Sequence, residues 1–190
     1  MDIFGYAVLA ILVVALLYII IAYNRLVSIK HNVDLAWSNI DILLKQRHDE
    51  LPKLVEACKQ YMKHERETLQ RVTEARGQVA QAREAGNVGA LGAAEGMLRM
   101  GLGQLFAVVE NYPELKADQS FMHLQGRISG LENQIADRRE FYNDAVNINN
   151  VAIELFPDLF IANWFRFGPR ELLEFSEAEK ADVDLKSLFK

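Results

Sequence analysis

The chain has 190 residues, of which 51% are hydrophobic and 25% charged, so it can bury a substantial core and is too apolar for intrinsic disorder. Its formal net charge of −5, from 21 Lys+Arg and 26 Asp+Glu, excludes a generally basic nucleic-acid-binding protein. Its single Cys excludes an intramolecular disulfide framework and any zinc or iron–sulfur site that needs several Cys ligands.

The first predicted element is a transmembrane anchor over residues 1–24. Between Ile3 and Asn24 there is no Asp, Glu, Lys or Arg, and a helix of this length is about 30 Å long, the thickness of a bilayer's hydrocarbon core. A cleaved signal peptide is the alternative, but the chain starts with Met1-Asp2 instead of basic residues and no A-x-A site follows. We therefore expect an uncleaved, single-pass anchor.

Flanking charge predicts the orientation of this anchor. Arg25, Lys30, Lys45 and Arg47 lie downstream, whereas only the terminal amine lies upstream, offset by Asp2. The positive-inside rule then places the N-terminus outside and the rest of the chain in the cytoplasm.

Apolar residues recur at three- and four-residue spacing over residues 25–155. The four predicted stripes are Ile29, Val33, Ala36, Ile40 and Leu43; then Leu54, Cys58, Tyr61, Leu69, Val72, Ala75, Val79 and Ala82; then Leu91, Ala94, Leu98, Gly101, Leu105, Val108 and Tyr112; and finally Phe121, Leu124, Ile128, Leu131, Ile135, Arg138, Tyr142, Ala145, Asn149 and Ala152. This period is typical of helices packed at shallow angles. The pattern predicts an all-α fold in which the anchor continues into a long antiparallel, up-down four-helix bundle.

Helix-breaking residues separate the predicted helices. The segment from Asp49 to Pro52 is expected to end one helix and open the next, with Asp49 as a cap. Gly86-Asn87 favours a left-handed turn. Pro113 is expected to stop the third helix near Tyr112, and Asp118 to cap the fourth.

The predicted third helix is unusually rich in glycine. Six of the eleven Gly lie between Gly86 and Gly103, which weakens the helix by about 1 kcal/mol per Gly relative to Ala. The GxxxG-like spacing of Gly92 and Gly96 favours close packing, either within the bundle or between subunits. A second membrane span over residues 88–109 is a less favoured alternative, because Glu95 and Arg99 lie at its centre.

The sequence contains no recognisable catalytic constellation. No His has a Glu three residues before it, as a di-iron bundle requires, and His64-Glu65 is not completed to H-E-x-x-H because Thr68 occupies the last position. Cys58 lies on an apolar stripe, where a thiol packs as a small hydrophobic group. Arg47-His48-Asp49 is interpreted as a solvated cap. We expect no enzymatic activity, no cofactor and no metal site.

Polar residues interrupt the seam of the fourth helix and its edges: Glu132, Asn133, Arg138, Tyr142, Asn143, Asn149 and Asn150. A buried hydrogen-bond network that sets the helix register is the favoured interpretation. A ligand or partner site between helices is the alternative.

An aromatic C-terminal segment, residues 156–175, precedes an acidic tail, residues 176–190. Two arginines lie among its aromatic side chains, and the candidate membrane-interface residues are Phe160, Trp164, Phe165, Arg166 and Arg170. Rings and guanidinium groups together suit the lipid headgroup boundary. The competing interpretation is that these side chains cap the bundle core or a neighbouring subunit.

Several motifs resemble the LemA family. They are Tyr23-Asn24-Arg25-Leu26-Val27, Ala36-Trp37-Ser38-Asn39-Ile40-Asp41, Arg47-His48-Asp49 before Leu51-Pro52, His64-Glu65, Glu110-Asn111-Tyr112-Pro113-Glu114-Leu115-Lys116-Ala117, Glu132-Asn133, Arg138-Arg139, Tyr142-Asn143 and Phe156-Pro157. The chain departs from the family pattern at Glu50, Lys53 and Asn149. The resemblance implies a bacterial inner-membrane protein with a long-helix cytoplasmic domain. It brings no established reaction, and a magnetosome-associated relative in the family implies an organising role.

These observations favour a membrane-anchored, self-associating scaffold or adaptor whose partners are membrane lipids and further copies of itself. The alternative is a regulatory partner of another membrane protein, such as a protease or a sensor.

Overall fold

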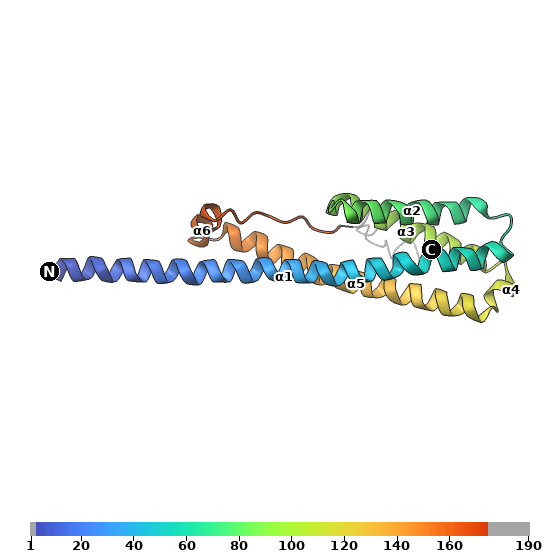
Figure 1. The fold of residues 1–190 in the computed structure, drawn as a ribbon, viewed down its shortest axis with the longest axis horizontal. Coiled ribbons are helices and arrows are strands. Elements are labelled where there is room, and N and C mark those ends of the chain that lie inside the picture. Colours follow the sequence, from blue (N-terminus) through green and yellow to red (C-terminus); the bar gives the residue numbers. More distant parts are fainter. Residues whose placement is uncertain (1–2, 175–190) are drawn as a thin grey trace, which may run out of the picture. The chain divides into compact units, whose positions relative to one another are not determined.

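The computed structural model describes residues 3–174, and this part of the chain is helical with no strand (Figure 1). Its helices are α1 (Ile3–Tyr61), α2 (Arg66–Glu84), α3 (Val88–Val109), α4 (Pro113–Lys116), α5 (Gln119–Glu154) and α6 (Asp158–Trp164). The all-α prediction is confirmed. The predicted acidic tail, 176–190, lies outside the described residues.

The chain divides into two compact units. Unit 1 comprises residues 1–39 and 140–172, and unit 2 comprises residues 40–139 and 173–190. Helices α1 and α5 therefore contribute their sequence to both units.

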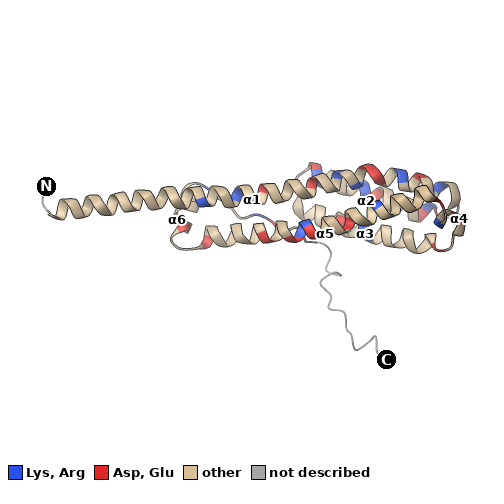
Figure 2. Ribbon diagram, turned by 90° about the horizontal axis from the view of Figure 1, so that it is seen from below, with Lys and Arg blue, Asp and Glu red and all other residues tan. Residues whose placement is uncertain are grey.

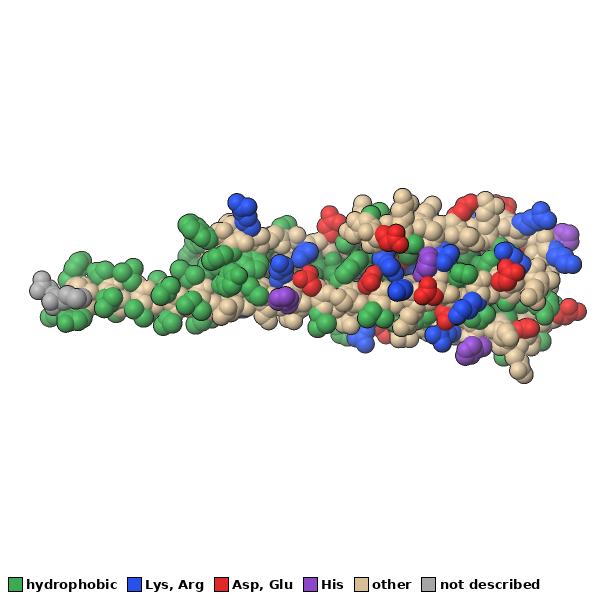
Figure 3. All heavy atoms as spheres, in the orientation of Figure 1, with side chains coloured by type: hydrophobic (Ala, Val, Ile, Leu, Met, Phe, Trp, Pro, Cys, Tyr) green, Lys and Arg blue, Asp and Glu red, His purple; other side chains and the backbone are tan. Residues whose placement is uncertain are grey.

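Unit 1 has a small core and a long apolar surface. Its core combines side chains from three helices, α1, α5 and α6: Ala22, Leu26, Ala152, Ile153, Ile161 and Ala162. The beginning of α1 is different, because its most apolar 18-residue window has a mean hydropathy of 2.8 and none of it is buried. Hydrophobic side chains cover this part of α1 (Figure 3), and the ribbon shows no acidic or basic residue there (Figure 2). The first charged residue that follows in the sequence is Arg25. Among the helices described, α1 alone is long and apolar enough to cross a membrane.

Unit 2 contains the end of α1, α2, α3, α4 and the beginning of α5. The predicted stripe residues that are buried there include Leu54, Cys58, Leu69, Val72, Val79, Leu91, Leu98, Leu105, Phe121, Ile128, Leu131 and Ile135. Burial raises the pKa of the Cys58 thiol to about 12, as expected for a packing residue. Arg138 is exposed, so its predicted place on the fourth stripe is wrong, and its charge explains why it stays in solvent.

Two predicted helix boundaries are confirmed in detail. Gly86 adopts φ 64° after α2, and the Asn87 N–H donates to the Ala82 carbonyl at 3.1 Å, as in a Schellman turn. Asn87 then caps α3, because its Oδ1 accepts the Ala90 N–H at 2.8 Å. Asp118 caps α5 in the same way, accepting the Phe121 N–H at 2.9 Å.

Helix α1 continues through Pro52, so the predicted helix end and Asp49 cap are wrong. Proline lacks an N–H, which leaves the carbonyl four residues earlier, that of His48, without its helical donor. The Nε–H of Arg76, on α2, donates to that carbonyl at 3.0 Å. The helix beyond Pro52 also buries Leu54 and Cys58 completely, which offsets the usual penalty of about 3 kcal/mol for an internal proline.

The chain instead turns at residues 62–65, between α1 and α2. The second predicted stripe is therefore divided between two helices, with Cys58 on α1 and Leu69 on α2. Arg76 also places Nη2 2.7 Å from Nε2 of His48. Burial and this guanidinium lower the His48 pKa, so the ring accepts the hydrogen bond in its neutral form.

Arg47 is buried, which corrects its interpretation as part of a solvated cap. Its side chain is 1% exposed and forms ion pairs with Glu95 of α3 and Glu132 of α5. Burial opposes the Arg47 charge, but the two carboxylates outweigh it and raise the Arg47 pKa. Because each carboxylate accepts from a different guanidinium nitrogen, this one side chain connects three helices.

Residues 173 and 174 of unit 2 pack on the glycine-rich helix α3. Leu173 is buried, and a Cβ added to Gly92 would lie 1.9 Å from the Glu174 carbonyl oxygen. Glycine at this position of α3 therefore leaves room for the backbone at residue 174.

Replacing Arg76 with Leu should lower the free energy of unfolding by about 1–3 kcal/mol, because the His48 carbonyl loses its donor. In a Pro52→Ala background the backbone N–H restored at that position supplies the donor, so Arg76→Leu should have a clearly smaller effect. Denaturant unfolding of the full chain in detergent measures both differences. Equal losses in the two backgrounds would show that Arg76 does not replace the missing N–H.

Gly92→Ala should lower the free energy of unfolding by about 1.5–3 kcal/mol, since the added methyl displaces residue 174 and exposes Leu173. Gly103→Ala is the matched control on the same helix, because nothing lies within 4 Å of its added Cβ. It should raise stability by up to about 1 kcal/mol through helix propensity. The same sign for both variants in thermal unfolding would contradict the close approach at Gly92.

Candidate functional site

Helix α6 exposes its aromatic side chains. Asp158, Ile161 and Ala162 are buried at helical spacing, whereas Phe156 just before the helix is 78% exposed and Trp164 at its end is 83% exposed. A short helix in water would bury its largest rings first. Here the small side chains pack on α1 and α5, and the large rings form the outer surface.

The end of α6 forms a Schellman turn with arginine at the position that glycine usually occupies. Arg166 has φ 59°. The Phe167 N–H donates to the Ala162 carbonyl at 2.9 Å, and the Arg166 N–H to the Asn163 carbonyl at 3.3 Å. A left-handed conformation at a residue with a Cβ is unfavourable by about 1 kcal/mol. Arg166 is exposed at this point.

Asp158 forms a polar contact below the aromatic surface. Its side chain is 5% exposed and pairs with Arg25 of α1, whose own side chain is 54% exposed. The Tyr18 hydroxyl donates to the same carboxylate. Asp158 is not among the residues predicted from the sequence, although it is the only acidic residue in the aromatic segment 156–170. Its position in the sequence, among apolar and basic residues, could have identified Asp158 as a buried, paired carboxylate.

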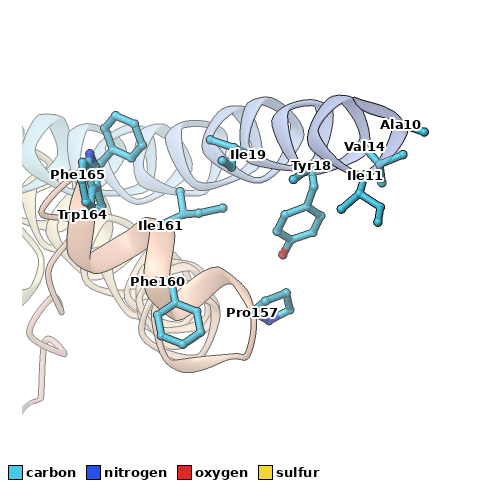
Figure 4. Close-up of a pocket in the computed structure, with 11 residues that line it drawn as sticks. Ala10, Ile11, Val14, Tyr18, Ile19, Pro157, Phe160, Ile161, Trp164 and Phe165 are labelled. Atoms are coloured by element: carbon cyan, nitrogen blue, oxygen red, sulfur yellow. The ribbon is translucent and has the colours of Figure 1, made fainter. Parts of the chain in front are cut away.

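An apolar groove lies between α1 and α6. Its volume is about 990 Å³, and its lining includes Ile11, Val14 and Tyr18 of α1 together with Phe160, Trp164 and Phe165. In Figure 4, the α1 side chains lie along one wall and the α6 side chains along the other. The groove is therefore bounded on one side by the exposed apolar window of α1.

A second, polar pocket shares Phe165 with the groove. Its volume is about 540 Å³, and it is lined by Lys30, His31, Arg166 and Arg170 among others. Tyr23 also lines it, and its ring centroid lies 4.7 Å from that of Phe165. The polar lining of this pocket is predominantly basic.

Polar residues of α5 hold the segment that follows α6. The Asn150 Oδ1 accepts the Arg170 N–H at 2.8 Å, and its Nδ2 donates to the Arg170 carbonyl at 2.9 Å. The Asn149 side chain donates to the Gly168 carbonyl at 3.3 Å, and the Tyr142 hydroxyl to the Glu171 carbonyl at 2.9 Å. Burial raises the Tyr142 pKa further above neutral pH. These three side chains hold the non-helical segment 168–171 against α5, and their bonds to it do not connect two helices. The predicted role of the polar residues of α5 in setting the helix register stays a prediction.

The structure brings the five candidate interface residues together in unit 1. Phe160, Trp164 and Phe165 are exposed on or beside α6, and Arg166 and Arg170 line the basic pocket. Arg170 also pairs with Asp34, with 3.3 Å between Nη2 and Oδ1. Gly92 and Gly96 lie in α3 of unit 2, where Gly92 is buried and Gly96 half-buried.

Within residues 3–174, no group of three or more His, Cys, Asp or Glu side chains could hold a metal ion. The buried charged side chains in this part of the chain form ion pairs, as Arg47 does with the buried Glu95 and Glu50 does with the exposed Arg127.

Comparison with known proteins gives three relatives with the same name. The magnetosome proteins MamQ 1 and MamQ 2 of Paramagnetospirillum magneticum are each 24% identical over 190 aligned residues, covering 88% of this chain and 69% of the relative. Magnetosome protein MamQ of Magnetospirillum gryphiswaldense is 24% identical over 167 residues, covering 76% and 61%. The profile of the LemA family matches residues 36–186. Since this match spans most of the sequence and all of the packed helices of unit 2, the chain belongs to the LemA family.

Proposed function

We propose that this chain is a membrane-anchored, non-enzymatic helical scaffold or adaptor, which self-associates and organises protein or membrane assemblies. The observation that carries the proposal is the combination in unit 1 of a wholly unburied apolar window on α1 with exposed rings on α6. Two adjacent apolar surfaces of this kind are unfavourable in water and suit a bilayer.

In this proposal the first part of α1 spans a bacterial inner membrane once. Arg25 and Lys30 follow the uncharged run, so the N-terminus lies outside and the helical domain is cytoplasmic. The end of α1, α2, α3 and α5 form the up-down four-helix bundle of that domain. The contacts of Arg47 with α3 and α5, and of Arg76 with α1, support this arrangement.

Helix α6 is then a foot at the membrane boundary. Asp158 contacts Tyr18, which lies inside the uncharged run, and Arg25, which ends it. The foot therefore lies beside the last turns of the span, where aromatic rings favour the interface. Ion pairing with Arg25 makes it less unfavourable for the Asp158 carboxylate to lie at this depth.

Self-association is assigned to an exposed seam on α5. Phe141 and Ile148 are exposed on α5 at seven-residue spacing, and Val151 is exposed one turn later. Leu155, directly after the end of α5, continues the same spacing and is also exposed. This repeat is the pattern of a coiled-coil interface. We prefer this seam to the Gly92 and Gly96 positions for contact between subunits, because Gly92 packs against Glu174 of its own chain. Docking of another membrane protein on the seam is the competing outcome.

Trp164 should be quenched by brominated lipids in liposomes when Trp37 is changed to Phe, because the exposed indole of α6 then reports membrane contact. The reciprocal variant, Trp164→Phe, leaves Trp37 as the control. Trp37 lies 13 residues beyond Asn24, or about 20 Å along the helix, so it should escape quenching. Absence of quenching of Trp164 at every bromine depth, or release of the protein by alkaline carbonate, would reject the anchor-and-foot proposal.

Ile148→Glu should weaken self-association at least about tenfold, since each copy loses about 1.5–3 kcal/mol of apolar burial at the seam. Asn147→Glu is the matched control, because it adds the same charge at the neighbouring exposed position of α5. Native mass spectrometry in mild detergent measures the oligomer fraction of both variants. A strictly monomeric parent chain at all concentrations would reject self-association, and equal effects of the two variants would reject the seam.

A further inference from the structure

The apolar groove and the basic pocket of unit 1 are neighbours and are the two parts of one candidate site. They share Phe165, which lines both. The apolar part follows α1 from Ala10 to Ile19, and the basic part follows it from Tyr23 to His31. An elongated ligand with an apolar body and an anionic head matches this order along the helix.

The charges at the polar end support an anionic head. Lys30, His31, Arg166 and Arg170 line the pocket, and Asp34 offsets the last of these. Within residues 3–174, no carboxylate forms an ion pair with Lys30 or Arg166. The two cations therefore line the pocket without an ion-pair partner in this part of the chain.

The length of the apolar end supports an acyl chain. The distance from Ala10 to Tyr23 along α1 is about 20 Å, compared with about 15 Å for one leaflet of the hydrocarbon core. The groove volume of about 990 Å³ exceeds that of a single side chain, so the groove has room for a longer hydrocarbon chain. Aliphatic residues of α1 and aromatic rings of α6 line it, and such an apolar lining suits a hydrocarbon chain.

We propose that this two-part site binds one anionic phospholipid, with an acyl chain in the groove between α1 and α6 and the phosphate beside Lys30 and Arg166. The inference rests on the proposed membrane anchoring, because the lipid must be in the leaflet next to the helical domain. With the domain in the cytoplasm, that leaflet is the one in which anionic lipids and basic residues meet. Helix α6, the proposed foot, would then contact the membrane with a preference for anionic lipids.

Arg166 provides a variant whose loss of binding cannot be attributed to misfolding. Its left-handed conformation is one that glycine adopts more readily, so Arg166→Gly should leave the melting temperature unchanged or raise it. The same change removes one cation next to the phosphate, which should weaken anionic-lipid binding about fivefold. Lys63→Gly is the matched control, since it removes an exposed cation from the turn between α1 and α2.

The experiment titrates the delipidated full chain in non-ionic detergent with three probes. They are dioleoyl phosphatidylglycerol, dioleoyl phosphatidylcholine with the same acyl chains, and glycerol phosphate without them. Binding is followed by native mass spectrometry and by Trp164 emission in the Trp37→Phe background. We expect saturable binding of one phosphatidylglycerol, at least about tenfold weaker binding of phosphatidylcholine and no binding of glycerol phosphate.

Arg166→Gly tests the polar end of the site and Ala15→Phe tests its apolar end. Arg166→Gly should reduce the preference for phosphatidylglycerol about fivefold, whereas Lys63→Gly should keep it. Ala15→Phe fills the groove and should weaken both lipids equally. Equal binding of the two lipids, tight binding of glycerol phosphate, or an unchanged preference in Arg166→Gly would each overturn the inference. A chain that resists alkaline carbonate but shows no lipid preference contradicts this inference alone, whereas a chain that carbonate releases contradicts the proposed anchoring itself.

Discussion

The unburied apolar surface of α1 is the constraint on which the rest of unit 1 depends. No part of the 18-residue apolar window is buried, so any element beside it must tolerate an apolar environment. Helix α6 satisfies this condition by turning Phe160 and Trp164 outward and packing Ile161 and Ala162 inward. Its one acidic side chain, Asp158, is paired with Arg25 and Tyr18. If α1 spans the membrane as proposed, an unpaired carboxylate at this position would be strongly unfavourable.

In unit 2, α1 contains an unpaired carbonyl and a buried charge, and side chains of neighbouring helices pair with both. Pro52 leaves one carbonyl of α1 without a donor, and Arg76 of α2 supplies it. Arg47 is buried on α1, and Glu95 and Glu132 neutralise it from α3 and α5. In each case a local feature that disfavours the helix is compensated by a side chain far away in the sequence. The compensating side chains also fix which faces of the helices meet.

Features that depend on neighbouring residues were predicted from the sequence, whereas features that depend on a distant side chain were not. Helical spacing identified most buried residues of unit 2, such as Leu98 and Ile128, because periodicity is a local property. The turn at Gly86 and the cap at Asp118 were likewise readable from a few adjacent residues. Pro52 misled the prediction because the donor that replaces its N–H comes from another helix. For the candidate site, composition located the aromatic and basic residues of 156–170, whereas the role of Asp158 depends on a tyrosine 140 positions away.

This sequence separation also sets the order in which unit 1 can assemble during synthesis. Tyr18 and Asp158 are 140 residues apart, and Asp34 and Arg170 are 136 apart. The apolar start of α1 therefore leaves the ribosome long before α6 and the segment after it exist. At a translation rate of about 5–20 residues per second, α1 waits for roughly 7 to 28 seconds without its partners, whereas local helix formation takes about a microsecond or less. Unit 1 is thus completed late in synthesis, when the segment that contains α6 docks on a helix already in place.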